Sequence, residues 1–183
     1  MSFDFLDDWI NDVNAKIRFA ILSNDRIALD DLLDQRAIDK CYHIDAFEIC
    51  LENNYDLLLH LIKRYPIKDD LIFYNFIINE NIRLIFRDNI ENFEEKFLAY
   101  LENLIDRPPR SEFRYVNVTS LLKLFNDYSI TKAMFLVLCR NDNMKEIIKL
   151  LSKMRREDIQ DGINKMCLVT NKLSIAEYLL KVL

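Results

Sequence analysis

The amino-acid sequence contains a single glycine and three prolines among 183 residues. An all-β protein needs turn residues at intervals of about eight to twelve positions, and this chain cannot supply them. The same scarcity excludes the glycine-rich loops that hold nucleotide phosphates and the glycine-flanked nucleophile of α/β-hydrolases. Since 51% of the residues are apolar, the chain is predicted to fold, and to fold as an all-α protein.

A short pattern recurs along the chain at intervals of roughly 30 residues, within the range of repeat architectures. It consists of an asparagine, three residues, an apolar pair, two residues and a further apolar residue. Apolar residues at these spacings form one buried stripe on a helix. Asparagine can cap that helix and can also end the preceding helix in the left-handed conformation. The predicted turns between paired helices are Asn24, Asn53, Asn117, Asn143 and Asn171.

A single helix pair of this kind cannot bury its own apolar face, so neighbouring pairs are expected to stack. The predicted architecture is therefore a short α-solenoid of antiparallel helix pairs. We expect one domain, comprising an N-terminal cap at 1–13, repeats at 14–89, an inserted helix at 90–105, a proline break at 106–111 and C-terminal repeats at 112–183. The break is placed at Pro108 and Pro109, because proline removes a hydrogen-bond donor and stops helix propagation.

Three segments resemble the second helix of the ankyrin repeat: "NNYDLLLHLI" at 53–62, "NMKEIIKLL" at 143–151 and "NKLSIAEYLL" at 171–180. In each, an asparagine stands where the family has a glycine. The Thr-Pro-Leu-His opening of the family is absent and the linkers are short, so the β-hairpin fingers are expected to be reduced or absent. Short, glycine-poor chains of this type resemble proteins of large DNA viruses and intracellular pathogens. That resemblance implies a non-catalytic module that binds and modulates a host or regulatory protein.

Arginine and aromatic residues alternate in the segment that follows the prolines. Arginine interleaved with aromatic residues suits an acidic protein partner or single-stranded nucleic acid, and it also occurs in solvated linkers. The predicted partner-binding residues are Arg107, Arg110, Phe113, Arg114 and Tyr115, with Trp9 in the N-terminal segment. A nucleic-acid-binding regulator is the alternative function, although the net charge of −5, with acids and bases mixed, disfavours nucleic acid.

Catalytic and metal-binding patterns are weak. Cys41, His43, Cys50 and His60 lack the spacing of zinc ligands, and paired carboxylates such as Asp69 and Asp70 stand where helices are expected to start. We therefore predict no catalytic residue, no metal and no cofactor. The cysteines at equivalent repeat positions, Cys139 and Cys167, are interpreted as core residues.

The longest apolar runs are too short to span a bilayer, and the chain begins with an acidic segment rather than a basic leader. A cytoplasmic protein without membrane contact is expected, in the host cytoplasm if the chain comes from a virus or pathogen. Repeat arrays need polar ends to stay monomeric, so a homodimer is a further expectation, with the segment around Trp9 as its contact.

Overall fold

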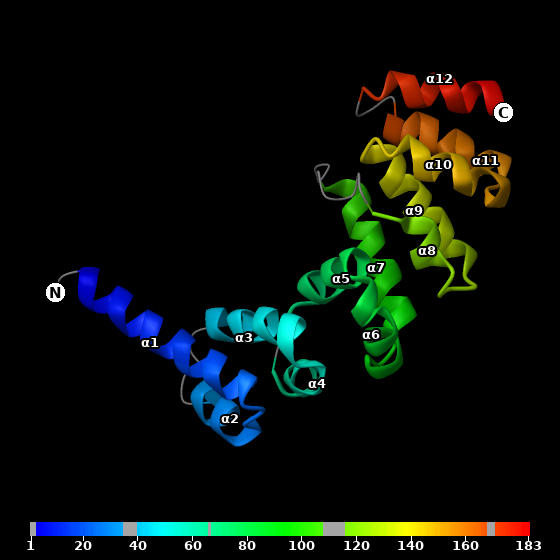
Figure 1. The fold of residues 1–183 in the computed structure, drawn as a ribbon. Coiled ribbons are helices and arrows are strands. Elements are labelled where there is room, and N and C mark those ends of the chain that lie inside the picture. Colours follow the sequence, from blue (N-terminus) through cyan, green and yellow to red (C-terminus); the bar gives the residue numbers. More distant parts are fainter. Residues whose placement is uncertain (1–2, 35–39, 66, 108–115, 168–170) are drawn as a thin grey trace. The chain divides into compact units, whose positions relative to one another are not determined.

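The computed structural model describes residues 3–34, 40–65, 67–107, 116–167 and 171–183, and for residues 3–12 and 40–41 it describes the backbone alone. Within these ranges every regular element is a helix and no strand occurs. The predicted all-α class is confirmed (Figure 1).

The chain divides into two compact units, Met1–Lys68 and Asp69–Leu183. We expected one domain with its break at 106–111, whereas the boundary between the units lies at Lys68. Pro66, close to that boundary, follows the end of a helix in the sequence. The helix at Phe93–Asp106, before this segment, contacts the helix at Tyr128–Arg140, after it, and both belong to the same unit.

The described residues of the first unit form four helices: α1 (Phe3–Leu22), α2 (Arg26–Asp34), α3 (Lys40–Asn53) and α4 (Tyr55–Arg64). Helix α1 contacts both α2 and α3, and α3 contacts α4. The segment that we expected to form a separate cap, 1–13, is continuous with the first paired helix from Phe3 onward. The core of this unit consists of fully buried aliphatic and aromatic residues, among them Ile17, Ile21, Leu29, Leu33, Ala46, Phe47, Leu58 and Leu61.

The second unit begins with α5 (Asp69–Ile78), η1 (Glu80–Ile82), α6 (Arg83–Asn89) and α7 (Phe93–Asp106). Helix α5 places Phe73 and Phe76 against Phe93 and Phe97 of α7, with ring centroids 4.7–5.7 Å apart. Such aromatic contacts add to the free energy of burial. The apolar α5 segment is thus largely buried.

The rest of the second unit contains α8 (Val118–Leu122), α9 (Tyr128–Arg140), α10 (Met144–Leu150), η3 (Leu151–Lys153), α11 (Arg156–Asp161), η4 (Gly162–Cys167) and α12 (Leu173–Val182). Helix α9 contacts α7, α8, α10 and the π-helical turn η4, so most of its surface is buried. Cys139 on α9 and Cys167 on η4 are both fully buried and form a hydrogen bond with each other.

The asparagines of the repeat pattern occupy helix ends in two different ways. Asn24 and Asn171 have φ of 56° and 58°, in the left-handed region. Asn117 and Asn143 are N-caps whose side chains accept hydrogen bonds from the backbone of Ser120 and Glu146. Asn53 is instead the last residue of its helix.

The cap that we placed at Asn53 belongs to its neighbour, Asn54, whose side chain accepts a hydrogen bond from the backbone of Leu57. At two turns the cap follows a left-handed residue: Asp25 caps α2 after Asn24, and Asn143 caps α10 after Asp142, with φ of 61°. At these turns the two tasks that we assigned to one asparagine are divided between adjacent residues.

Candidate functional site

The predicted partner-binding segment falls mostly outside the described residues. Arg110, Phe113, Arg114 and Tyr115 lie in 108–115, and the side chain of Trp9 belongs to the undescribed part of α1. Arg107 is described, and its Nη1 donates a hydrogen bond of 2.8 Å to Oδ2 of Asp70 on α5. That hydrogen bond raises the pKa of Arg107. The charge of Arg107 is therefore matched by a carboxylate of its own chain.

A set of polar contacts joins residues that lie 30 positions apart in the first unit. Asn54 Nδ2 donates to Asn24 Oδ1 over 2.8 Å, and His60 Nε2 lies 2.7 Å from Asp30 Oδ1. The guanidinium of Arg64 donates to Asp34, again at a separation of 30. We call these contacts, and those of the same spacing in the second unit, the 30-residue ladder.

The ladder continues in the second unit. Tyr128 Oη donates a hydrogen bond of 2.6 Å to Asp158 Oδ2, and Lys172 Nζ donates one of 3.3 Å to Asp142 Oδ2. Each pair lies 30 positions apart in the sequence. Residues separated by 30 positions, which is close to the interval of the sequence pattern, thus lie next to each other in both units.

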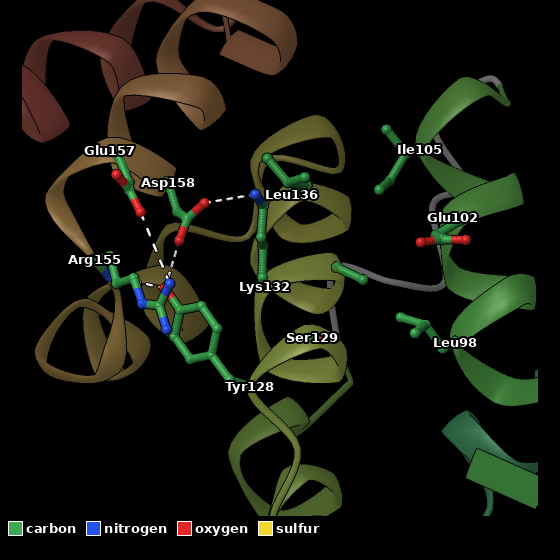
Figure 2. Close-up of a pocket in the computed structure, with 11 residues that line it drawn as sticks. Leu98, Glu102, Ile105, Tyr128, Ser129, Lys132, Leu136, Arg155, Glu157 and Asp158 are labelled. Atoms are coloured by element: carbon green, nitrogen blue, oxygen red, sulfur yellow. Dashed lines mark hydrogen bonds and ion pairs between the residues drawn. The ribbon is translucent and has the colours of Figure 1, made fainter. Parts of the chain in front are cut away.

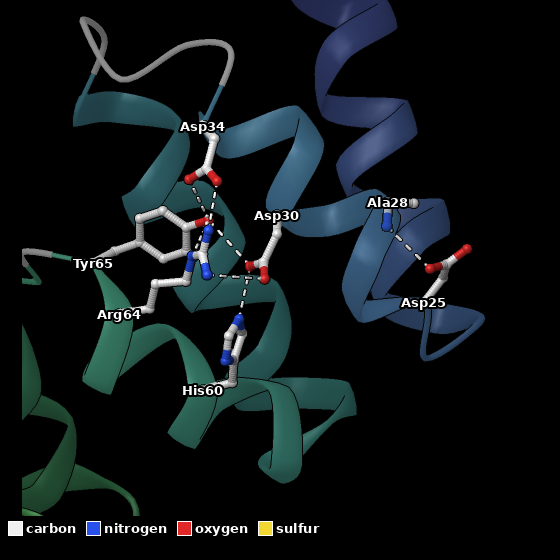
Figure 3. Close-up of polar contacts among 7 residues, drawn as sticks. All are labelled: Asp25, Ala28, Asp30, Asp34, His60, Arg64 and Tyr65. Atoms are coloured by element: carbon white, nitrogen blue, oxygen red, sulfur yellow. Dashed lines mark hydrogen bonds and ion pairs between the residues drawn. The ribbon is translucent and has the colours of Figure 1, made fainter.

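Five side chains form a polar cluster between α2 and α4, namely two ladder pairs and Tyr65 (Figure 3). Tyr65 Oη donates to Asp30 Oδ1 over 3.1 Å and to Asp34 Oδ1 over 3.0 Å. Burial, together with the hydrogen bond to Asp34, raises the pKa of Tyr65. The side chains of His60 and Asp30 are only 9% and 16% exposed. Both carboxylates are engaged by side chains of the α4 segment, so the cluster joins the two helices.

Two of the residues that we considered as metal ligands, His43 and His60, make different contacts. His43 lies beside the ring of Tyr65, with centroids 4.7 Å apart, whereas His60 faces Asp30. Burial raises the pKa of the Cys50 thiol to about 12. Across the described part of the chain, no group of three or more His, Cys, Asp or Glu residues is placed to hold a metal ion.

A cavity of about 390 Å³ opens in the second unit between α7, α9 and the start of α11 (Figure 2). One wall, on α7, carries Leu98, Glu102 and Ile105, and these side chains face α9. The opposite wall and the floor are formed by Tyr128, Ser129, Lys132, Ala133, Leu136, Arg155, Glu157 and Asp158. We call this the Tyr128 cavity. It combines apolar surface with charges of both signs.

A buried carboxylate organises the polar side of the Tyr128 cavity. Asp158 is 4% exposed, and its two oxygens contact Lys132 Nζ and Tyr128 Oη, each at 2.6 Å. Burial opposes ionisation of Asp158, but the hydrogen bonds from Lys132 and Tyr128 outweigh it and lower the pKa of the carboxyl group. These contacts hold the tyrosine ring in one orientation.

Arg155 completes this side of the cavity. Its guanidinium lies over the Tyr128 ring, 4.6 Å from the centroid, and its backbone N–H donates to Tyr128 Oη over 2.9 Å. A weaker ion pair of 3.8 Å links Arg155 to Glu157. A guanidinium stacked on an aromatic ring is stabilised by cation–π attraction. The arrangement is a preformed polar and aromatic surface beside an apolar wall.

Sequence reasoning did not identify Tyr128, Arg155 or Asp158 as site residues. The available signal was the repeat itself, because Tyr128 and Asp158 are separated by the same 30 positions as the other ladder pairs.

None of the helices in the described ranges is both long enough and apolar enough to cross a bilayer. Comparison of the sequence with protein-family models and with curated proteins, and of the chain with solved structures, finds no match.

Proposed function

We propose that the chain is a non-catalytic protein–protein interaction module made of stacked antiparallel helix pairs, and that it binds and modulates a regulatory protein. The 30-residue ladder supports the stacked arrangement. Side chains separated by about one repeat length become neighbours when each copy of a repeat lies against the next copy. Two helix pairs in the first unit are linked in this way by Asn24–Asn54, Asp30–His60 and Asp34–Arg64.

The observation that carries the proposed binding function is the Tyr128 cavity. Tyrosine and arginine are the residue types that most often contribute strongly to protein–protein affinity. Here Tyr128 and Arg155 are held in place by Asp158 and by each other, so little side-chain entropy is lost when a partner docks. A cavity of about 390 Å³ accommodates one or two partner side chains.

The charges around the cavity indicate what those partner side chains carry. Lys132 is paired with Asp158, and Arg155 with Glu157. Glu102, on the α7 wall, is exposed and forms no ion pair with any residue in the described ranges. The cavity therefore suits an apolar side chain that enters between Leu98 and Leu136, accompanied by a basic residue beside Glu102.

The lowered pKa values of two carboxyl groups argue against acid–base catalysis by these groups. A carboxyl group that works as a general acid or base near neutral pH has a raised pKa. The pKa values of Asp158 and Glu146 are lowered, although burial acts in the opposite direction on both. Both side chains are engaged in contacts that join helices.

The proposal is tested by capturing partners from a eukaryotic lysate with the tagged chain and quantifying them by mass spectrometry at low and high salt. The same capture is repeated with Glu102→Arg, which reverses a charge in the Tyr128 cavity, and with Glu177→Arg, which makes the same change at an exposed position of α12. Circular dichroism verifies that both variants fold.

We expect one or two proteins that persist at high salt with the wild type and with Glu177→Arg, and that are lost with Glu102→Arg. If Glu102→Arg captures the same proteins, the binding surface does not lie at the Tyr128 cavity. The result could also be that the chain retains only proteins bound to nucleic acid, and that these are lost with nuclease or high salt. That result would support the alternative function, nucleic-acid binding through the segment that begins at Arg107.

A further inference from the structure

Two rows of side chains form the long walls of the Tyr128 cavity. The row on α7 consists of Leu98, Glu102 and Ile105, and the row on α9 consists of Ser129, Ala133 and Leu136. In each row the residues are spaced at i, i+4 and i+7, so they lie on one face of their helix. The two helices pack against each other, and both rows run in the same direction along the cavity (Figure 2).

The groove between the rows is about as long as two turns of a helix. Seven positions separate the first and last residue of each row, which is roughly 10 Å at a rise of 1.5 Å per residue. The α9 row begins with two small side chains, Ser129 and Ala133, and these leave room between the helices. Leu98 and Ile105 are only half-buried, so the α7 row keeps apolar surface at both of its ends.

One negative charge of the cavity is unbalanced. Three carboxylates and two cations line it, and Lys132 is paired with Asp158 and Arg155 with Glu157. The remaining carboxylate is that of Glu102, which is exposed and has no ion pair within the described ranges. Because Glu102 lies between Leu98 and Ile105 in the α7 row, a complementary occupant presents a cation with an apolar side chain on either side of it.

The backbone around the groove favours an occupant that is itself a helix. Both long walls are α-helices, whose N–H and C=O groups are bonded within the helix. An extended segment would find no backbone group to pair with in these walls, whereas a helix satisfies its own backbone groups. Side chains on one face of a helix also recur every three or four positions, which is the spacing of the α7 row. An amphipathic helix laid in a groove is a recurring mode of recognition.

We infer that the Tyr128 cavity takes a helical segment of a partner protein that carries a basic residue between two apolar residues. The apolar residues lie four positions from the basic residue on one side and three on the other, which is how Leu98 and Ile105 are placed about Glu102. The basic residue contacts Glu102, and the apolar residues contact Leu98 and Ile105. The inference rests on the proposed function, because it names the kind of partner that the same cavity binds.

The test selects binding peptides from a library displayed on yeast. Each peptide is a single helix on an alanine-rich scaffold, which favours helix formation, with the positions of one face randomised. The selection is run separately on the full wild-type chain, on Glu102→Arg and on Glu177→Arg, the control at an exposed position of α12. On the wild type and Glu177→Arg we expect enrichment of Arg or Lys with apolar residues at the stated spacing. On Glu102→Arg we expect Asp or Glu in place of the basic residue.

Binding of an enriched peptide is then measured in solution by fluorescence anisotropy. Replacing its basic residue by Glu should weaken binding to the wild type by about tenfold or more, and should strengthen binding to Glu102→Arg. This exchange of preference separates a charge contact from a folding defect, because an unfolded variant would bind neither peptide. The inference is wrong if no peptide is enriched, if the enriched peptides lack the stated spacing, or if Glu102→Arg selects the same basic residue as the wild type.

The peptide selection and the capture from a lysate distinguish this inference from the proposed function. A partner may be lost from the capture with Glu102→Arg while the selection enriches no such helix. In that case the cavity binds a partner of another shape, and only the inference fails. A partner that Glu102→Arg still captures would overturn the proposed binding site, and with it the inference that a partner's helix docks there.

Discussion

Asp30 and His60 lie 30 positions apart in the sequence, and Asp30 Oδ1 is 2.7 Å from His60 Nε2. Asn24 with Asn54, Asp34 with Arg64, Tyr128 with Asp158 and Asp142 with Lys172 have the same separation. Polar contacts between helices thus recur at close to the interval of the sequence pattern, in addition to the packing of the apolar core.

The Asp30–His60 contact should contribute measurably to stability, because both side chains are mostly shielded from solvent. In a double-mutant cycle with Asp30→Ala and His60→Ala, we expect a coupling free energy of about 1 kcal/mol at neutral pH, measured by urea unfolding. The matched cycle pairs Asp30→Ala with Lys63→Ala, whose side chain is exposed. A coupling no larger than in that control would mean that the ladder is incidental to stability.

Gly162 should tolerate no larger side chain. A Cβ atom at this position would lie 2.6 Å from Cε1 of Phe135 and 3.4 Å from Sγ of Cys139. Since Phe135 is fully buried on α9, it has little room to move, and Gly162→Ala should lower the free energy of unfolding by roughly 1–3 kcal/mol. Adding Phe135→Leu should recover part of this loss. Equal effects of Gly162→Ala in both backgrounds would contradict the contact.

The second unit should lose stability in acid. Glu146 is 3% exposed and accepts hydrogen bonds from Thr119 and Lys149; burial opposes its ionisation, but these contacts lower its pKa. The pKa of Asp158 is also lowered. Both carboxyl groups bind protons more readily in the unfolded chain than in the folded chain. Their contribution to the free energy of unfolding is therefore complete at neutral pH and is lost as the pH falls below about 4.

Urea unfolding at neutral and acidic pH measures this dependence. Glu146→Gln should make the free energy of unfolding less sensitive to pH, by about 1.4 kcal/mol for each unit by which the pKa of Glu146 is lowered. Glu177→Gln is the control at an exposed position. If both variants kept the pH dependence of the wild type, the loss of stability in acid would not be due to Glu146.

The two kinds of asparagine should respond differently to the same substitutions. Asn171 has a positive φ of 58°, so Asn171→Gly should be neutral or stabilising, and Asn171→Ala should cost about 1 kcal/mol. Asn117 has φ of −78° and caps α8. Asn117→Asp should leave the free energy of unfolding nearly unchanged, and Asn117→Ala should lower it by about 1 kcal/mol. Thermal unfolding measures the stability of the Gly, Asp and Ala variants at each site. If the three variants rank in the same order at both sites, the distinction between a left-handed turn residue and an N-cap is wrong.

Much of the local structure could be predicted from single residues and their spacing. The lone glycine and the helical period of the apolar residues determined the all-α class, and the segment at 90–105 corresponds closely to α7. Asn24 and Asn171 stand at left-handed turns because few other residues adopt that backbone easily. At Asn53 the prediction missed the cap by one position, since two consecutive asparagines carry the same local signal.

The sequence by itself determined the helical class, the helix ends marked by asparagine and the recurrence of a pattern at about 30 residues. Capping, turn conformation and amphipathic spacing act over a few neighbouring positions, so they can be recognised in a string of letters. Only the tertiary structure decided the boundary at Lys68 and the pairing of Asp158 with Tyr128 and Lys132. These features depend on which helices pack together, because packing between distant segments sets burial and brings together charges that local sequence leaves apart.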